Sequence, residues 1–343
     1  MNNKNVTFFN HTSNDTSTED WAAFLRLVST PPHKIHNAKE GRHSLEREDI
    51  VQTITSQEGF ATLENNSVLG TLPTMSNARI EFAGTGNVLY CEEGVKLNGT
   101  IRFPGNNALV VLRASNHLYR LDLTVHNHCL FYSGNGSYFN GALHAICSEG
   151  CSIVLGDDCL YSFGIWIRTA DPHLVYDATS KRRLNPSKDV LVGDHVWVGQ
   201  DAMILKGTHI GSGSILGARA VTSGELCSNA SWAGVPARCL REDIFWDDAC
   251  VHPWTPEQTE KSQVYQKEPA LFRHDGQTVR VDELLACLRE PHDAEQRLAV
   301  VKERLIATAG NRFYLGAKTK PQDKASRGAL KSAASRLFGR GDR

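Results

Sequence analysis

Residues 192–221 read VGDHVWVGQDAMILKGTHIGSGSILGARAV, and an aliphatic residue returns at every sixth position of this stretch. Glycine follows most of these positions, and the fifth place of each hexad is small or β-branched. A period of six fits neither the 3.6-residue turn of a helix nor the two-residue alternation of a long strand. It is typical of a hexapeptide β-helix, in which each hexad forms one short strand and one turn. The aliphatic positions are Val192, Val198, Ile204, Ile210 and Leu216.

The same phase can be followed upstream. Three hexads close one triangular coil, and residues 155–172 form such a coil in phase with residues 192–221. Between them, residues 173–191 are polar, contain Pro186 and lose the hexad pattern, which predicts a loop extruded from one corner of the coil. Farther upstream, apolar residues alternate with polar ones between Gly and Asn turns, which indicates earlier and less regular coils. These apolar residues are Ile80, Val95, Leu97, Ile101, Phe103, Val110, Leu112, Leu121, Leu123 and Val125.

The chain divides into four predicted parts. We expect an N-terminal extension over residues 1–75, partly helical because apolar residues around Trp21 share one helical face. A left-handed β-helix is predicted over residues 76–241, and a helical region with 3.6-residue spacing over residues 242–315. Residues 316–343 are basic and have the composition of a disordered tail. The predicted fold class is therefore mainly β, a hexapeptide-repeat left-handed parallel β-helix with an N-terminal extension and a C-terminal helical region.

Composition and charge exclude several classes of protein. The chain has 343 residues, 41% of them hydrophobic and 22% charged, which allows a sizeable core. Its formal net charge of −1 gives no overall attraction to nucleic acid, so no nucleic-acid partner is expected. There is no apolar run long enough to span a bilayer, and the first residues lack the order of a signal peptide. The nine cysteines form no CxxC pair, so neither a disulfide framework nor a metal site is expected, and a cytoplasmic location is the simplest interpretation.

Residues 155–241 resemble the hexapeptide-repeat acyltransferases. The resemblance is carried by the order GDHVW, G, IG, GA and GVPAR within the segment that ends at Arg241. Within that family, the segment is most similar to O-acetyltransferases of bacterial capsular polysaccharides and lipopolysaccharides. The resemblance implies acetyl transfer from acetyl-CoA to a carbohydrate hydroxyl. It also implies a homotrimer in which the donor lies between adjacent solenoids.

The resemblance further implies a catalytic histidine on the loop before the last coils, and His173 occupies the matching position. An alkoxide is inaccessible near pH 7, so attack on a thioester needs a base that titrates near neutrality, as imidazole does. Trp197 matches the tryptophan that the family places near the thioester or acceptor. Its indole N–H can donate to the developing oxyanion, or its face can pack on the acetyl group, and the sequence leaves both open. Asp171 can orient His173 by accepting a hydrogen bond from the other ring nitrogen.

Donor contacts are also implied by the resemblance. Small residues can line the pantetheine chain with their backbone groups, and arginine suits phosphates by its charge and fork geometry. The chain departs from the family at Thr222-Ser223-Gly224, where many members have Thr-Lys, and at Arg219, where glycine is usual. These departures bear on the phosphate contacts rather than on the fold. The residues carried over are Gln200, Ala218, Thr222, Ser223, Arg238 and Arg241.

Three other functions differ from this one in the residues that they require. A γ-type carbonic anhydrase needs three histidines on zinc, but Gln200 and Leu205 stand where two of them would be. A sugar-nucleotide N-acetyltransferase shares donor and fold and differs only in the acceptor pocket. A non-catalytic scaffold needs neither His173 nor Trp197, because packing alone demands neither. The sequence leaves the identity of the sugar, the hydroxyl and the acyl chain length open.

Several charged or titratable residues are interpreted as structural. His195 is predicted on the exterior of a coil, and His126, His128 and His144 are expected to be surface or structural residues of the irregular coils. Arg168 and the cations of residues 181–188 are interpreted as solvated, with contact to an anionic acceptor as the alternative. The tail from Lys318 is interpreted in the same way, and the alternative is peripheral contact with the inner face of the membrane.

Overall fold

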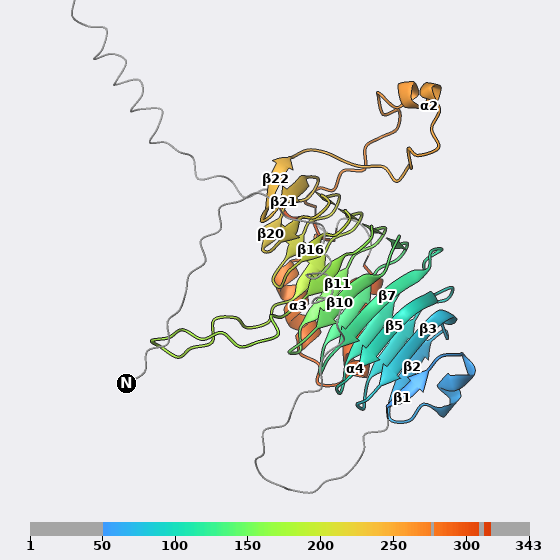
Figure 1. Cartoon of the computed structure of the whole chain (residues 1–343), viewed down its shortest axis with the longest axis vertical. Coiled ribbons are helices and arrows are strands. Elements are labelled where there is room, and N and C mark those ends of the chain that lie inside the picture. Colours follow the sequence, from blue (N-terminus) through green and yellow to red (C-terminus); the bar gives the residue numbers. More distant parts are fainter. Residues whose placement is uncertain (1–50, 276–277, 309–311, 317–343) are drawn as a thin grey trace, which may run out of the picture. The chain divides into compact units, whose positions relative to one another are not determined.

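A computed structural model describes residues 51–275, 278–308 and 312–316 of the chain. The predicted helix around Trp21 and the basic tail beyond residue 316 lie outside the described residues. The structure is a parallel β-helix whose strands stack into three sheets, and the predicted fold class is confirmed (Figure 1).

Sheet A has eight strands along one side of the coils. Its neighbouring strands are parallel, except that β1 pairs antiparallel with β3 at one edge. In order across the sheet these strands are β1 (Gln52–Ile54), β3 (Thr74–Phe82), β5 (Lys96–Phe103), β7 (Tyr119–Val125), β10 (Leu143–Cys147), β13 (Trp166–Arg168), β16 (Met203–Ile204) and β19 (Val221–Thr222).

Sheets B and C form the other two sides. Sheet B has eight strands: β2 (Ser67–Gly70), β4 (Val88–Cys91), β6 (Leu109–Leu112), β8 (Leu130–Ser133), β11 (Ser152–Leu155), β14 (Val190–Val192), β17 (His209–Ile210) and β20 (Glu225–Leu226). Sheet C has six: β9 (Tyr138–Phe139), β12 (Leu160–Tyr161), β15 (Trp197–Val198), β18 (Ile215–Leu216), β21 (Ser231–Gly234) and β22 (Ala237–Arg241). Within sheet C, only β22 runs antiparallel to its neighbour.

The hexad positions stack as the sequence predicts. Leu155 pairs with Val192, and Val192 pairs with Ile210, so inward residues of successive coils lie directly over one another. All three side chains have no exposed surface. A Cβ at Gly199 would lie 2.6 Å from the backbone nitrogen of Ala218 in the next coil. Glycine is therefore required there because two coils approach too closely for a side chain.

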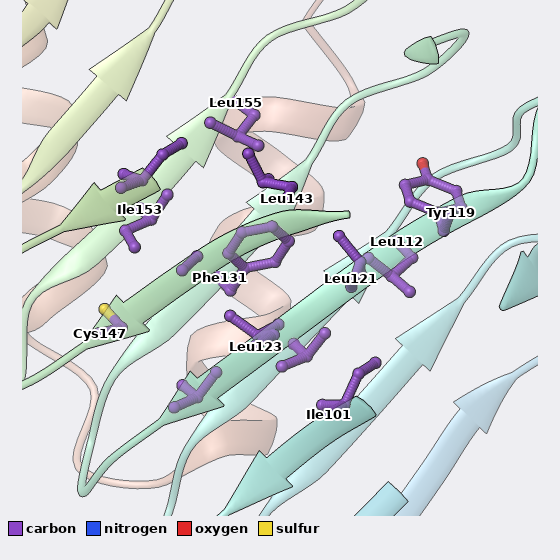
Figure 2. Close-up of a cluster of buried hydrophobic side chains, with 14 of the residues drawn as sticks. Ile101, Leu112, Tyr119, Leu121, Leu123, Phe131, Leu143, Cys147, Ile153 and Leu155 are labelled. Atoms are coloured by element: carbon purple, nitrogen blue, oxygen red, sulfur yellow. The ribbon is translucent and has the colours of Figure 1, made fainter. Parts of the chain in front are cut away.

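Coils before Leu155 are built differently. Val88 pairs with Leu109 and Leu109 with Leu130, a repeat of 21 residues, and strands of sheet A reach nine residues in β3. Every apolar residue predicted to face inward in this region has at most 3% exposure. Figure 2 shows several of them, including Ile101, Leu121 and Leu123, pointing into the interior between the sheets.

Two predicted boundaries differ from the structure. The coils begin with β2 at Ser67 rather than at residue 76, because the first strands lack the hexad spacing that marks the later ones. Val190 and Leu191, predicted as the end of the loop, belong to β14 and are fully buried. Their apolar side chains continue sheet B, and the extruded loop therefore ends at Asp189.

The C-terminal region covers the outer face of sheet B. Strands β6, β8 and β11 are buried at every residue because their outward side chains pack against helices α3 (Val281–Arg289) and α4 (Ala294–Val301). Helix α4 continues into the π-helical segment η2 (Lys302–Ile306), and a short 3-10 helix, η1 (Glu58–Thr62), precedes β2. Burial on both faces explains why these strands are uninterrupted apolar runs.

The predicted C-terminal helical region, residues 242–315, contains helices, and it also contains extended segments. Besides α3, α4 and η2, the structure has one short helix, α2 (Pro256–Lys261), which Thr255 caps. The remaining described residues of this region form extended segments. Pro253 and Pro269 each remove a backbone N–H, which disfavours helix on either side of α2. Within the described residues, no helix has the length and apolar character needed to cross a membrane.

Arg312 joins the C-terminal segment to the corner between sheets B and C. Its guanidinium is 1% exposed and lies 2.5 Å from an Asp194 carboxylate oxygen and 3.0 Å from an Asp157 oxygen. The backbone carbonyl of Phe313 then accepts a hydrogen bond from the Ser212 N–H at 3.0 Å. A buried charge needs such partners, and here they bind the last described residues to the coils.

Candidate active site

The extruded loop is a hairpin arm that leaves the coils after β13 and returns at β14 (Figure 1). Tyr176 and Arg183 form an antiparallel bridge, and the Leu184 N–H donates to the Val175 carbonyl at 2.8 Å. At the tip, the Asp177 carboxylate accepts from the Ser180 N–H at 2.7 Å and from its hydroxyl at 2.8 Å, which lowers the pKa of Asp177. The arm is thus an ordered element with its own hydrogen bonds.

Glu149 anchors the returning strand of the arm to the coils. Its carboxylate accepts from both terminal nitrogens of Arg183, at 2.8 and 3.0 Å, and from the Ser187 hydroxyl at 2.6 Å. These hydrogen bonds favour the charged form, so the pKa of Glu149 falls to about 2. The anchor is therefore fully ionised at neutral pH.

His173 lies on the exposed outgoing strand of the arm, and Asp171 does not bond its ring. The Asp171 carboxylate instead accepts from the Lys206 ammonium at 2.5 Å and from the Asn185 amide at 3.1 Å. These two contacts lower the pKa of Asp171. The same Asn185 amide donates to the His173 carbonyl at 2.7 Å. In this structure Asp171 fixes the base of the arm, which corrects the expectation that it orients the imidazole directly.

Trp197 projects outward from β15 in the middle of sheet C. Its neighbours across the strands are Leu160 on one side and Ile215 on the other. The indole is 40% exposed, whereas the next residue, Val198, points inward and is fully buried. The alternation of a two-residue strand thus places Trp197 on the surface.

One chain does not bring His173 and Trp197 together. The arm leaves from the corner between sheets A and B, and in a three-sided coil this corner lies opposite sheet C, which carries Trp197. Exposed apolar side chains mark the arm: Leu174, Val175, Tyr176 and Leu184 are each 49–60% exposed. Within one chain, His173 and Trp197 therefore lie on different sides of the solenoid.

His195 is held on the exterior of a coil by Trp246. The two rings stack with centroids 4.0 Å apart and an interplanar angle of 7°. The Trp246 indole N–H donates to the His195 carbonyl at 2.9 Å, and His195 Nε2 lies 3.2 Å from the Trp246 carbonyl. Because that carbonyl can only accept, the hydrogen bond requires a proton on Nε2, which leaves that nitrogen unable to accept a proton from a substrate.

The residues carried over for coenzyme A lie on two edges of the solenoid. Gln200 and Ala218 follow β15 and β18 at the corner between sheets C and A, where the Arg219 N–H donates to the Gln200 carbonyl at 2.7 Å. Ser223 follows β19 at the corner between sheets A and B. Arg238 and Arg241 are exposed on β22. Both edges have exposed small or polar residues, and sheet A separates them.

Thr222 differs from the other carried-over residues. It pairs with Ile204 at an inward position, and only 2% of it is exposed. Its carbonyl accepts from the Leu205 N–H at 3.0 Å and from the Thr208 hydroxyl at 3.0 Å. The Thr222 hydroxyl therefore faces the core and not the surface on which a donor would lie, because it occupies the hexad position of its strand.

Two further features lie away from His173 and Trp197. A cavity of about 390 Å³ opens between the base of the arm and α3, lined in part by Lys188, His209 and Arg289. Among the described residues, one group combines three side chains of metal-binding type: Cys227, Cys239 and Glu242, with ligand atoms within 4.8 Å of one another. The group offers three protein ligands at the end of the solenoid, one fewer than a closed structural zinc site has.

His144 and Arg168 both pack on Trp166. His144 Nδ1 lies 3.0 Å from an Asp122 oxygen, and its ring stacks on Trp166 at 4.5 Å. Arg168 covers the same indole at 4.8 Å, so this arginine is held against an aromatic ring. Burial lowers the pKa of His126, which favours its neutral form.

Sequence reasoning missed Trp246, Asn229 and Arg312. Their partners lie 43 to 118 residues away along the chain, so no local spacing connects them. The sequence contains only a weak signal for a structural role of these residues. Asn229 stands in a left-handed turn with φ of 52°, a conformation that asparagine tolerates better than most residues, and a polar residue in that context often has a structural role.

Comparison with known proteins identifies the repeat. The family model "Bacterial transferase hexapeptide (six repeats)" matches residues 189–224, which run from the return of the arm through β19. The crystal structure of a polySia-specific acetyltransferase, NeuO, superimposes on 57% of this chain and 93% of its own, with a TM-score of 0.50 and 24% sequence identity. This similarity shows a shared fold.

Proteins of similar sequence identify the family. The polysialic acid O-acetyltransferase of Neisseria meningitidis is 31% identical over 146 residues, which is 42% of this chain and 67% of that enzyme. A protein of the same name from Escherichia coli O1:K1 is 28% identical over 106 residues. The match covers 31% of this chain and spans 34% of that relative's length. A putative lipopolysaccharide biosynthesis O-acetyltransferase of Escherichia coli K12 is 30% identical over 35% of this chain and 66% of its own length. The chain therefore belongs to the hexapeptide-repeat acyltransferases, as the predicted resemblance has it.

Proposed function

We propose that the protein is an O-acetyltransferase that transfers acetyl from acetyl-CoA to a sugar hydroxyl of a bacterial surface glycan. The observation that carries this proposal is the match to the polysialic acid O-acetyltransferase of Neisseria meningitidis, which extends over two thirds of that enzyme. An ordered arm with an exposed histidine and a surface indole on the neighbouring coils supports it. The nine free cysteines are consistent with a reducing compartment, and we place the reaction in the cytoplasm.

In the proposed mechanism, His173 is the general base. A neutral imidazole nitrogen takes the proton from the acceptor hydroxyl while that oxygen attacks the thioester carbonyl carbon. As the tetrahedral species collapses, the carbon–sulfur bond breaks, and the imidazolium returns the proton to the departing thiolate. The products are the acetyl ester and free coenzyme A, and His173 ends in the form in which it began.

Trp197 is proposed to support the same step from sheet C. Its exposed indole can donate its N–H to the oxyanion or cover the acetyl group. Both roles need the indole to be held in one orientation, because a donor that must reorganise loses much of its effect. Asp171 and Asn185 are proposed to fix the arm, so that His173 is presented from a rigid base.

We further propose that the active unit is a homotrimer. The arm and sheet C lie on opposite sides of one solenoid, and the arm carries apolar side chains that a neighbouring copy would cover. Closed cyclic symmetry lets each arm reach the next solenoid, which completes three equivalent sites. Light scattering should give a particle of three chains. A monomer of 37.9 kDa at all concentrations would contradict the shared site.

The direct test is acetyl transfer from acetyl-CoA to a panel of purified capsular polysaccharides, lipopolysaccharides and nucleotide amino sugars. We expect an acetyl ester on a polysaccharide, detected by mass and removed by mild alkali, which cleaves esters but leaves amides intact. An alkali-stable acetyl group on a nucleotide amino sugar would instead show an N-acetyltransferase.

A further inference from the structure

The C-terminal segment brings a second tryptophan against the candidate site. The ring centroids of Trp246 and Trp197 lie 6.1 Å apart with an interplanar angle of 47°, within the range of tilted aromatic contacts. Trp246 follows the last strand of the solenoid and is only 8% exposed, whereas Trp197 is 40% exposed. One indole is therefore a buried support and the other is a surface group beside it.

Trp246 is fixed by His195, which belongs to the same turn as Trp197. It stacks on His195, and the two residues exchange hydrogen bonds between ring and backbone at 2.9 and 3.2 Å. His195 has φ of 52° in the turn that precedes β15, only two residues before Trp197. The turn that presents Trp197 is thus the same turn that holds Trp246.

Asn229 fastens the segment that carries Trp246. Its carbonyl accepts from the Ile244 N–H at 2.9 Å. Its side-chain amide donates to the Phe272 carbonyl at 2.7 Å and accepts from the Phe272 N–H at 3.0 Å. One residue of the last coil therefore holds both ends of the segment 244–272 against the solenoid. Asn229 is 9% exposed, so these bonds are shielded from water.

We propose that Trp246 is a positioning residue for acetyl transfer, which holds the Trp197 indole in its working orientation. This inference rests on the proposed function. Leu160 and Ile215 flank Trp197 in the neighbouring strands of sheet C. Trp246 adds an aromatic contact from outside the parallel strands of that sheet. The proposal gives the C-terminal segment a role beyond covering the coils.

The kinetic test is a double-mutant cycle between Trp246→Ala and Trp197→Ala. We expect Trp246→Ala to lower kcat about tenfold or more, because small misplacements of a catalytic group carry large losses, with the KM for acetyl-CoA changed less than about twofold. In the Trp197→Ala background the same substitution should lower kcat by less than about twofold, since its target is gone. An equal loss in both backgrounds would overturn the proposal.

Phe245→Ala is the matched control. Phe245 precedes Trp246 but packs edge-on against Tyr265 at 4.8 Å, away from Trp197. Phe245→Ala removes a comparable ring from the same segment but keeps Trp246. We therefore expect it to leave kcat within about twofold. Asn229→Gly keeps the left-handed turn and removes the amide clasp, so it should reproduce the loss of Trp246→Ala in part. A Phe245→Ala loss equal to that of Trp246→Ala would point to general loosening and count against a specific role.

A spectroscopic test separates this inference from the proposed function. The chain has six tryptophans, and 5-fluorotryptophan labelling with Trp197→Phe as the assignment variant identifies the ¹⁹F resonance of Trp197. That resonance should shift or broaden in Trp246→Phe and stay unchanged in Phe245→Ala, whatever the substrate. An unchanged Trp197 resonance in Trp246→Phe would overturn the positioning role. If the Trp197 resonance is perturbed but the protein acetylates no acceptor, the contact between Trp246 and Trp197 stands and the proposed function is rejected.

Discussion

The coils before Leu155 and those after it bury their interiors equally well but by different means. The earlier coils repeat every 21 residues or so along sheet B and use strands of up to nine residues in sheet A. Several of the later coils repeat every 18 residues, as in the pairing of Val198 with Leu216, and most of their strands have two or three residues. Only the later coils carry the hexad pattern, the arm and Trp197.

This difference has a physical origin. A coil with three equal sides of six residues must turn after every short strand, so its glycines and inward residues recur in strict register. A coil with two long sides buries alternating residues instead and can hold aromatic rings, as in the stacked pair Phe82 and Phe103 at 4.7 Å. The earlier coils therefore serve as a core under the helices, and the later coils position surface groups to a fixed repeat.

The largest expected effect is a loss of acetyl transfer without a loss of stability. His173→Ala should lower acetyl transfer by between about 10² and 10⁴, the usual cost of removing a general base. The imidazole is exposed and outside the coils, so thermal stability and oligomeric state should not change. Turnover and donor binding measured on one preparation would check this, with exposed His252→Ala as the control. Full activity in His173→Ala would move the chemistry away from the arm.

Damage to the helices that cover sheet B should have the opposite signature. Leu288 on α3 is fully buried against the outer face of sheet B. Leu288→Ala should lower the free energy of unfolding by about 2–5 kcal/mol through a cavity and lost apolar burial, with kcat unchanged below the melting temperature. Denaturant unfolding and kinetics would measure both. Cys287→Ala on the same helix is only partly buried and should cost clearly less.

The strict repeat of the later coils can be tested by a single methyl group. In Gly199→Ala the new Cβ would meet the Ala218 backbone nitrogen at 2.6 Å, so the coils must separate, at a cost of about 1–3 kcal/mol. Gly217→Ala is the matched variant one coil further on, where the nearest atom is the Ala233 side chain at 3.0 Å. It should lower the melting temperature less. Equal losses would argue against close coil spacing as the cause.

The smallest effect concerns the anchor between the two regions. Glu149→Gln removes the charge that holds Arg183, and for so exposed a pair the change in global stability should stay below about 1 kcal/mol. The arm itself should exchange its amide hydrogens faster. Because the pKa of Glu149 is lowered from 4.5 to about 2, its stabilisation is complete above pH 4.5 and is lost as the pH falls toward 2. Exchange of arm amides, corrected for intrinsic rates, should rise in that window in the wild type but not in Glu149→Gln.

Much of the fold could be predicted from the sequence because burial in a hexad coil depends on one residue in six. Val192, Ile204 and Leu216 are fully buried, as the pattern required. The arm was predictable as well, since the hexad pattern stops before it and resumes after it. The cover on sheet B was missed, although four consecutive apolar residues in β6 mark a strand with both faces buried.

The candidate site was less predictable than the fold. The family resemblance supplied His173 and Trp197, and their roles remain predictions. It also supplied Thr222, but the side chain of Thr222 faces the core. A sequence match gives a position along the chain and does not distinguish inward from outward side chains. The role of Trp246 could not be predicted from the sequence, because its contact with Trp197 depends on the hydrogen bonds between Asn229 and Phe272, which are 43 residues apart.

The antiparallel strands at the two ends have a consequence for polymerisation. A stack of parallel coils could in principle add further coils without limit, because each terminal strand exposes unpaired backbone groups to a second copy. Here β1 occupies the first edge of sheet A, and β22 occupies the last edge of sheet C. Each is short and reverses the chain direction, so a second solenoid cannot continue the same parallel ladder on these two sheets. Among the described strands, β1 and β22 therefore cap one sheet at each end of the solenoid against continuation by a second copy.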